Sequence, residues 1–497
     1  MTQAYSRGFA LAIITLLAST APVIAHAQSP GEAASATATA EQVDSLQKQV
    51  QALQAQLDAL KQQLPKATPS WKGAPQSDDA ATGFSFKPKG TLQFDAGYVG
   101  YPGDPAGTLG PVSAATGAAG VNSNNLGFNT RLRRAIIGAE GSLPGGFGYN
   151  VEFELSQAGV GYEDVVLTYQ RKGSPLQLKL GYQFPLSSLE LSSSSRFISF
   201  MERPGGTDAF GYTRRLGLSA AYMKPEFLVS AGLFGDDVAN ANFNRTGWQA
   251  STRAVWMPKF GGTQLHLGVN AQYRTAARDA QNVRLRQRPY TQTTDQRPLD
   301  TGRIAADGDM IVGLEAAGII KSFHVVGEMQ WLKVRGINDP AHIFAPNNGT
   351  GGAAAFLADD PSFWSGYLEA GLYLTGETRG YKGGRWDRTK VLRPFDKGGW
   401  GAVQLNARID RTDLQDRVAA GAITPGSLNF VNGGKQTGYQ LGVSWLPTDY
   451  LRFIAQYGHV DVVGGPAAIA PFAAATGAFQ DRSYKLDVMT VRAQVDF

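Results

Sequence analysis

Two stretches of the sequence concentrate basic side chains whose chemistry is the binding of anions. Residues 376–397 carry basic residues at seven positions and acidic residues at three. Residues 185–213 add Arg196 and Arg203 and lead directly into Arg214 and Arg215. The planar guanidinium group of Arg forms paired, charge-assisted hydrogen bonds with phosphate and similar anions. If the fold brings both stretches to one narrow place, they predict a site or a passage that prefers anions.

The residues that could support catalysis are not spaced for it. The chain has no Cys, so it offers no thiolate nucleophile, disulfide or thiolate metal site. His266, His324, His342 and His459 are scattered without metal-ligand spacing, and neither a Gly-x-Ser-x-Gly motif nor a phosphate loop is present. The sequence therefore predicts no cofactor and no enzyme. A barrel enzyme with a Ser, a His and an acid converging at its outer rim remains the alternative.

From Phe84 onward, apolar and polar residues alternate in segments of about ten residues, which turn residues separate. Strands produce this period of two because successive side chains point to opposite faces. Repeated along a chain, the pattern is typical of a membrane β-barrel. Sixteen such segments are predicted, near residues 86–100, 128–142, 148–157, 160–171, 176–184, 214–222, 227–236, 246–257, 263–274, 309–320, 323–335, 362–375, 399–410, 436–446, 449–461 and 484–497.

The last segment, 484–497, alternates without a break. Met489 and Val491 fall on the face expected to meet lipid, and Thr490 and Arg492 fall on the opposite face. A half-buried strand of a soluble sandwich would alternate in the same way, so it is the alternative for any single segment. Repetition favours the barrel, and closure is required in a membrane because an open edge leaves backbone amides unpaired. Tyr, Trp and Phe at segment ends suit the two interfaces.

The connections between the segments alternate between short and long, which sets the expected orientation. Outer-membrane barrels have short periplasmic turns and long external loops. The long loops are expected at 101–127, 185–213, 275–308, 336–361, 411–435 and 462–483. The basic stretch 376–397 breaks this rule, since it is long and yet falls on the periplasmic side.

Strand parity also predicts which side chains line the lumen. Arg131 and Arg133 belong there if Leu132 and Ile136 face lipid, although Arg134 shares the face of Leu132. The other basic positions on that face are Lys179, Arg215, Arg253, Arg274, Arg408, Arg452 and Arg492, and the acidic ones are Asp95, Glu152, Glu154, Asp164, Glu328, Asp410 and Asp496. Because the wall is mixed, anion selectivity would require clustering of cations at the narrowest zone. Cross-strand ion pairs that only stiffen the wall are the alternative.

The amino-terminal region is predicted to export the chain and to associate it with others. Residues 1–27 read as a signal peptide with Ala25-His26-Ala27 as the cleavage site, and a retained anchor is the alternative. A small-residue linker, 28–40, leads to a heptad seam in 41–64, and a polar tether, 65–83, follows. Three heptads are too short to be stable alone. We expect three such helices to associate in a barrel trimer, although Val and Leu at the core positions suit two. A lone helix lying on a partner or on peptidoglycan is the alternative.

The chain resembles the phosphate-selective porin O and P family over roughly residues 83–497. The resemblance rests on Ser199-Phe-Met-Glu-Arg203, Arg214-Arg-Leu-Gly-Leu218, Tyr373-Leu-Thr-Gly-Glu-Thr-Arg-Gly-Tyr381 and Val491-Arg-Ala-Gln-Val-Asp-Phe497. It implies a homotrimer of sixteen-stranded channels in the bacterial outer membrane, in which the third external loop and a long basic turn enter the lumen. Gly401-Ala-Val-Gln404 departs from the Gly-Ala-Trp-Glu typical of the family.

These observations predict an all-β, 16-stranded antiparallel transmembrane β-barrel, 84–497, with a short N-terminal coiled-coil helix. The expected function is passive diffusion of small anions, such as phosphate or polyphosphate, across the outer membrane. A general or sugar-admitting porin is the alternative, and its constriction would show an aromatic track. No nucleic-acid partner is expected. The residues predicted to line the constriction are Arg131, Arg133, Lys179, Arg196, Arg203, Arg214, Arg215, Arg379, Lys382 and Arg385.

Overall fold

The computed structural model describes residues 44–45, 47–56, 83–100, 126–156, 159–235, 247–277, 281–338, 354–357, 359–417, 430–465 and 483–497. The chain divides into two units, Met1–Ser77 and Asp78–Phe497. In the first unit residues 44–45 and 47–56 are helical, with the apolar side chains of Val50 and Leu53 exposed. The predicted signal peptide, the linker and almost all of the tether lie outside the described residues.

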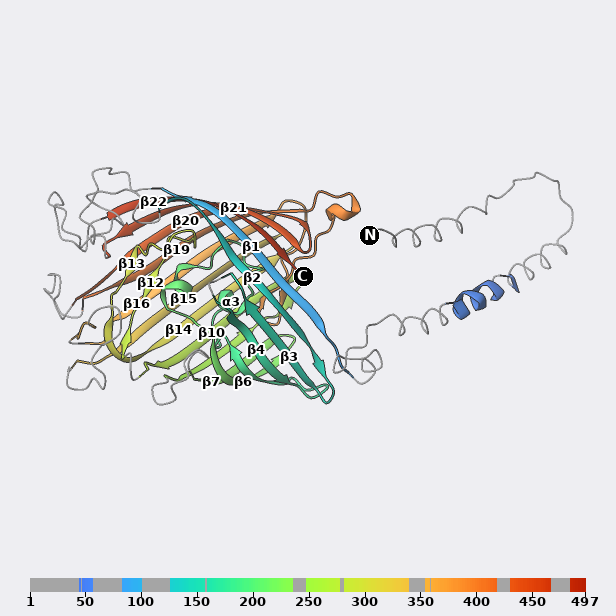
Figure 1. Ribbon diagram of the computed structural model, residues 1–497, viewed down its shortest axis with the longest axis horizontal. Helices are drawn as coiled ribbons and strands as arrows, with labels where there is room; N and C mark the ends of the chain where they lie inside the picture. Colours follow the sequence, from blue (N-terminus) through green and yellow to red (C-terminus); the bar gives the residue numbers. More distant parts are fainter. Residues whose placement is uncertain are drawn as a thin grey trace, which may run out of the picture. The chain divides into compact units, whose positions relative to one another are not determined.

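The second unit is a barrel of sixteen long antiparallel strands, which run obliquely around a common axis (Figure 1). The strands are β1 (Lys87–Val99), β2 (Gly127–Leu143), β3 (Phe147–Glu154), β4 (Gly161–Tyr169), β5 (Leu176–Gln183), β6 (Arg215–Lys224), β7 (Phe227–Phe234), β8 (Gln249–Trp256), β10 (Thr263–Thr275), β14 (Ile304–Ile320), β15 (Phe323–Gly336), β16 (Ser362–Tyr373), β19 (Ala402–Arg417), β20 (Phe430–Thr448), β21 (Leu451–Val463) and β22 (Ser483–Asp496). The short strands β9 (Lys259–Phe260) and β11 (Asn282–Val283) extend the same sheet.

The barrel closes where the first strand meets the last. β1 pairs with β2 on one side and with β22 on the other, so the sheet has no free edge at this seam. Beyond the end of β22, Phe497 and Gly90 exchange backbone hydrogen bonds of 3.0 and 3.1 Å. The aromatic ring of Phe497 lies against Gly90, where a Cβ atom would approach the ring to 2.5 Å. The predicted barrel and its strand number are confirmed.

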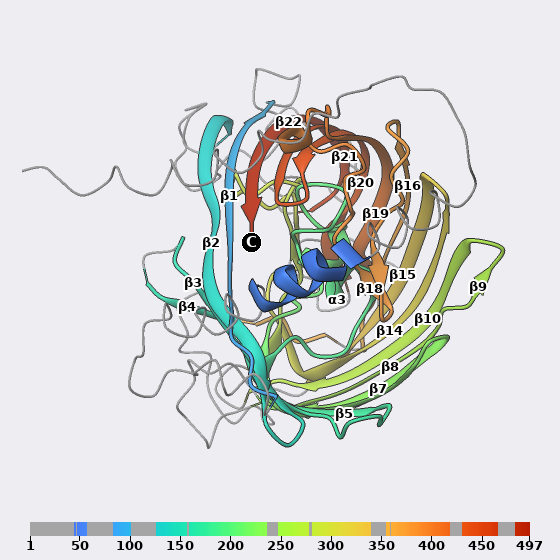
Figure 2. The same cartoon turned by 90° about the vertical axis from the view of Figure 1, so that its right-hand side faces the viewer.

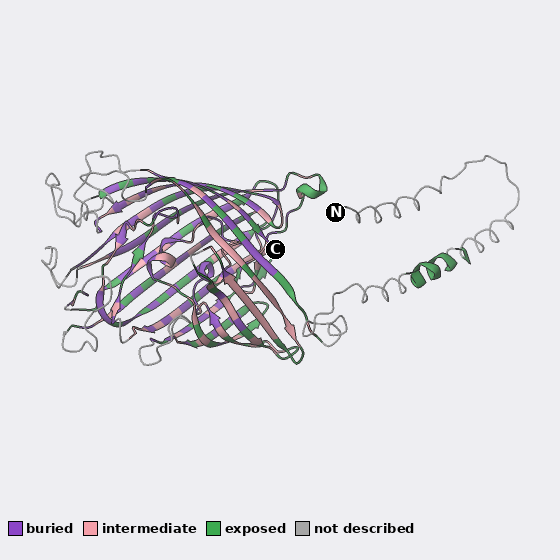
Figure 3. Cartoon of the chain, viewed as in Figure 1, coloured by how far each residue is buried: buried purple, intermediate pink, exposed green. Residues whose placement is uncertain are grey.

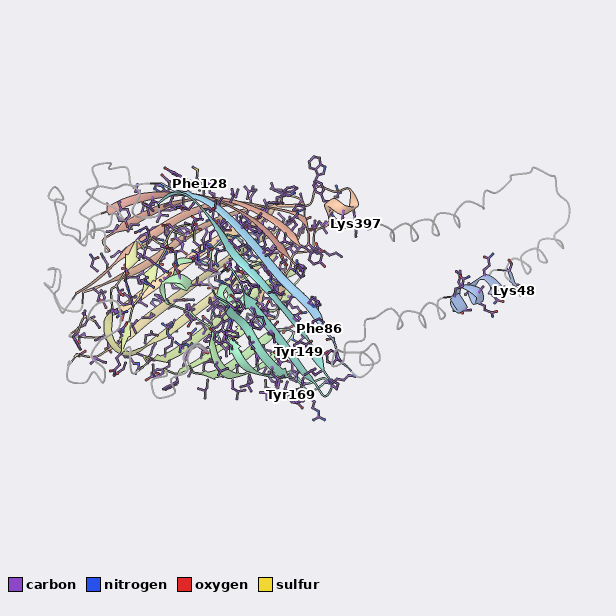
Figure 4. The ribbon with its side chains drawn as sticks, viewed as in Figure 1. Lys48, Phe86, Phe128, Tyr149, Tyr169 and Lys397 are labelled. Carbon is purple, nitrogen blue, oxygen red and sulfur yellow. The ribbon has the colours of Figure 1, made fainter. Side chains whose placement is uncertain are left out.

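The wall alternates between the lipid face and the lumen, as the sequence predicts. In β22, Met489 and Val491 are exposed, whereas Thr490 and Arg492 are almost completely buried. The alternating exposure appears as stripes of green and purple along the strands (Figure 3). Aromatic side chains mark both ends of the wall: Phe86, Tyr149 and Tyr169 lie at one end, and Phe128 lies toward the other (Figure 4). No described helix is long and apolar enough to cross a membrane.

Three connecting segments fold into the lumen. The third external loop, 184–214, holds α3 (Leu189–Ser192) and α4 (Gly205–Ala209). The fifth, 276–303, holds β12 (Arg286–Gln287) and β13 (Leu299–Asp300) beside β11. The periplasmic segment 374–401 holds β17 (Tyr381–Lys382), β18 (Arg385–Trp386) and the 3-10 helix η3 (Phe395–Lys397). α3 and β18 lie within the ring of strands (Figure 2).

These segments bury most of the inner wall under apolar side chains. Leu285, Leu299 and Phe210 pack in one cluster with inward residues of β14, β15 and β20 to β22. Leu189 and Trp386 pack in a second cluster against Ile319 and Val326. The lumen is therefore divided: one side is filled with protein and the other side is left to the solvent.

Candidate functional site

The inner wall has a packed side and a water-accessible side. Inward residues of β15, β21 and β22 are mostly buried. Inward residues of β2, β3 and β5 are mostly half-exposed. We therefore expect a path for solutes through the barrel to run along β2 to β6, between that wall and the segments that fill the other side.

Four arginines of the packed wall are neutralised by carboxylates. Arg253 bonds Glu315 through two nitrogens at 2.9 and 2.7 Å. Arg408 bonds Glu369 at 3.0 and 2.7 Å, and Arg274 and Arg492 pair in the same way with Asp309 and Asp95. These four arginines fit the alternative to an anion site, in which ion pairs only stiffen the wall. The pairs cross-link neighbouring strands and the segments inside the barrel.

Segment 374–401 makes a tight turn through Gly383 and Gly384, both of which have positive φ angles. Such a two-residue turn favours glycine at both positions. It makes Lys382 and Arg385 direct cross-strand partners, and both side chains are exposed. Like charges placed opposite each other repel. Neither cation has an ion-pair partner among the described residues, so an anion between or beside them would stabilise the pair.

The tip of this turn is held against the barrel wall. Arg253 donates a hydrogen bond of 2.8 Å to the carbonyl oxygen of Gly384, and Leu228 and Val255 lie within 3.8 Å of where a Gly384 side chain would begin. On the water-accessible side, the positive charges of Arg385 and Arg214 both repel the charge of Lys179. The turn thus presents Arg385 toward the wall formed by β5 and β6.

Arg379 has a different role from its neighbours in the same segment. Its guanidinium group is buried, contacts Ser199 and His324, and lies 3.5 Å from Glu369 and 3.9 Å above the ring of Trp386. It therefore joins the basic segment to the third external loop and to the packed wall. It anchors the segment and is not available to a passing ion.

A β-bulge in β2 turns three arginines inward. The pairing register between β1 and β2 shifts after Gln93, so Arg134 lies opposite Gln93 while Leu132 faces outward opposite Phe94. Arg131 donates to the carbonyl oxygen of Gln292, Arg133 pairs with Glu202 at 2.8 Å, and Arg134 pairs with Glu163 at 2.8 Å. The expectation that Ile136 faces lipid is wrong. Ile137 is the exposed residue, because the extra residue of the bulge changes the parity.

The third external loop and the start of β6 supply the other predicted cations. Arg203 donates to the carbonyl oxygens of Glu190 and Ser193 at 3.1 and 2.7 Å. Arg215 donates a hydrogen bond of 3.1 Å to the carbonyl oxygen of Gly235. Arg214 pairs with Glu163 and Asp164 at 2.5 and 2.8 Å. Arg196 lies elsewhere, near Arg388 and Arg452 at the periplasmic end of the packed wall.

Glu202 supplies a negative charge in the third external loop, where two arginines contact its carboxylate. Burial opposes ionisation of this carboxyl group, but Arg133 and Arg492 outweigh the burial and lower the pKa of Glu202 to about 2. Its oxygens lie 2.8 Å from Arg133 and 3.0 Å from Arg492. Glu202 therefore fixes Arg133 in place and takes up much of its charge.

A further group of cations lies in the fifth external loop and was missed by the sequence reasoning. Arg284, Arg286 and Arg288 alternate with the buried side chains of Leu285 and Gln287. Burial and the neighbouring charge of Arg297 lower the pKa of both Arg286 and Arg288, while Asp208 and Asp295, each 3.8 Å from Arg288, oppose the effect there. The Arg-x-Arg-x-Arg spacing was a usable signal, because alternate residues of an extended segment share one face.

The predicted site residues thus separate into two groups. Arg131, Arg133, Lys179, Arg203, Arg214, Arg215, Lys382 and Arg385 lie on or near the water-accessible side, whereas Arg196 and Arg379 belong to the packed side. Among the described residues, no group of three or more His, Asp or Glu side chains is placed to hold a metal ion.

A closed membrane barrel with a charged, partly filled lumen is the architecture of a porin. The chain belongs to the phosphate-selective porin O and P family, whose model matches residues 112–497. An uncharacterised protein of Caulobacter vibrioides is 34% identical over 439 residues, which cover 86% of this chain and 77% of that protein. Porin O of Pseudomonas aeruginosa is 26% identical over 355 residues, covering 66% of this chain and 75% of that one. The protein is a channel of the bacterial outer membrane.

Solved porin structures match this chain in fold but share little of its sequence. The anion-selective porin from Comamonas acidovorans has a TM-score of 0.45 and 12% identity, covering 83% of this chain and all of that one. A trimer form of OmpT from Vibrio cholerae has a TM-score of 0.44 and 11% identity, covering 84% of this chain and all of that one.

Proposed function

We propose that the channel conducts small anions in preference to cations, with inorganic phosphate among them. The observation that supports this is the pair of exposed cations at the turn of segment 374–401, Lys382 and Arg385, which have no carboxylate partner among the described residues. On the packed wall, Arg253, Arg274 and Arg408 are each paired with a carboxylate. On the water-accessible side, Arg133, Lys179 and Arg214 are also paired with carboxylates. Lys382 and Arg385 have no such partner among the described residues, and Arg131 and Arg203 donate to carbonyl oxygens.

The location of these charges decides their effect on passing ions. Two unit charges about 4 Å apart interact by about 1 kcal/mol in bulk water and about 4 kcal/mol at the lower effective dielectric constant near protein. In a wide vestibule the same charges are screened beyond about 8 Å at physiological salt. Arg286 and Arg288 in the fifth external loop would gather anions at the mouth, and Lys382 and Arg385 would favour them in the narrow zone.

We also propose that three copies assemble through their barrels and that the helix in 41–64 supports this assembly. Val50 and Leu53 are exposed in the single chain, as a heptad seam is before it meets its partners. The OmpT structure described as a trimer form supports a threefold assembly for this chain as well.

The test is the reversal potential of single channels in a potassium chloride gradient, followed by titration with phosphate at constant ionic strength. The proposal predicts a reversal potential of the sign given by chloride permeation and a chloride current that phosphate reduces in the low-millimolar range or below. A potassium-selective channel would contradict the proposal. A weakly anion-selective channel that phosphate does not block would favour the general or sugar-admitting porin.

A further inference from the structure

The lipid face of the barrel carries a groove that is separate from the lumen. It has a volume of about 980 Å³ and crosses the outer surface from β7 and β8 to β16 and β19. Its lining is mostly apolar, with Arg411 at one end; Glu315 and Glu328 also belong to it, but their side chains are buried on the inner side of the wall. Small residues form its floor, since Ala316, Gly327 and Gly366 replace the large side chains that cover most of the lipid face.

Arg411 is unusual because its side chain points outward into the lipid face. It is exposed, it lies in the half of β19 that leads to an external loop, and its cross-strand neighbour is Gly366. Among the described residues no carboxylate pairs with it, since Asp413, on the same face, pairs with Lys435 at 3.2 Å. Its nearest aromatic neighbour is Trp364, whose ring centroid lies 5.6 Å from the guanidinium carbon.

We propose that this groove binds a phosphorylated lipid of the outer leaflet, with acyl chains in the groove and a phosphate group on Arg411. An Arg side chain on the lipid face of a barrel is destabilising unless it reaches the interface or meets an anion. Trp364 lies near the external end of β16, and Trp side chains of membrane proteins are enriched at the interfaces. Charge and shape therefore fit one ligand, an acylated phosphate ester.

The experiment counts lipids bound to the complete protein by native mass spectrometry from a neutral detergent, with lipid A added in its phosphorylated and dephosphorylated forms. The wild type should retain the phosphorylated form more tightly. Arg411→Gln should weaken its retention by about tenfold, as expected for the loss of one charge-assisted contact. Ala316→Phe, which fills the groove without changing charge, should weaken the retention of both forms.

Lys485→Gln is the matched control, because Lys485 is also an outward cation at the external end of a strand but already pairs with Asp461 at 3.4 Å. It should retain lipid as the wild type does. Equal retention of the two lipid forms by the wild type would overturn the proposal, and so would unchanged retention by Arg411→Gln. If Arg411→Gln dissociates the subunits while lipid binding stays constant, the groove contacts a second copy of this chain, and the lipid proposal is wrong. Conductance should not change in this variant, so the result is independent of the proposed anion channel.

Discussion

Replacing Lys382 and Arg385 together by Glu is expected to lower the chloride-to-potassium permeability ratio by at least about tenfold. The two side chains are exposed cross-strand partners at the inner tip of segment 374–401 and have no ion-pair partner among the described residues. A change of about 1.4 kcal/mol in the relative stability of anions and cations at the tip suffices for a tenfold effect. Two reversed charges within a few Å of the path exceed that value at the dielectric constants of a narrow pore. The reversal potential in a potassium chloride gradient measures the change.

Lys397→Glu provides the control, since Lys397 belongs to the same segment but lies in η3, outside the ring of strands (Figure 4). Its charge is exposed to bulk solvent, so salt should screen it and selectivity should hardly change. Arg379 is left intact because its loss would disturb the packing of the segment. If the double variant keeps the selectivity of the wild type, the tip does not face the ion path.

Glu369→Gln is expected to destabilise the folded barrel by about 3–5 kcal/mol, the usual cost of removing one member of a buried ion pair. Glu369 is fully buried. Its carboxylate oxygens lie 2.7 Å from the guanidinium group of Arg408 and 3.5 Å from that of Arg379. Its replacement leaves both guanidinium groups without their main counter-ion, and Glu190, 3.7 Å from Arg408, compensates only in part. Denaturant titration followed by gel mobility of the folded and unfolded forms measures the loss.

A matched substitution shows whether the loss of stability depends on the burial of the carboxylate or only on the loss of its charge. Glu140→Gln also removes a carboxylate that forms an ion pair, in this case with Lys89 at 3.0 Å. Unlike Glu369, however, the Glu140 side chain is 42% exposed. Exposed pairs contribute about 0–1 kcal/mol, so this variant should remain close to the wild type. Equal stability of the two variants would show that the Glu369 network does not hold segment 374–401 in the lumen.

Sequence reasoning predicted the wall well because each strand carries its own signal. The alternation in residues 484–497 follows from one face meeting lipid and the other meeting the lumen, and β22 spans Ser483–Asp496. The prediction of where β19 ends and β20 begins was less accurate. β19 extends to Arg417 and β20 begins at Phe430, beyond the predicted 399–410 and 436–446, because their pairing continues outside the alternating segments.

The interior was harder to predict, because it depends on contacts between distant segments. Strand parity placed Arg131 and Arg133 in the lumen, but the bulge that also brings Arg134 there leaves no clear mark in the sequence. Arg379 and Arg385 differ by six positions and look equivalent as isolated residues. Only the packing of Arg379 against Trp386 and Ser199 separates the anchor from the exposed cation.

The ion path can be tested directly, because the chain has no Cys and a single introduced thiol reports its own accessibility. Thr168→Cys places a thiol on the water-accessible wall opposite Lys179, and Ser444→Cys places one on the packed wall, where Ser444 is buried. Negatively charged methanethiosulfonate reagent, added during single-channel recording, should react at position 168 and reduce the anion current, with no effect at position 444. A current that falls on modification at position 444 and stays constant at position 168 would contradict a path along β2 to β6.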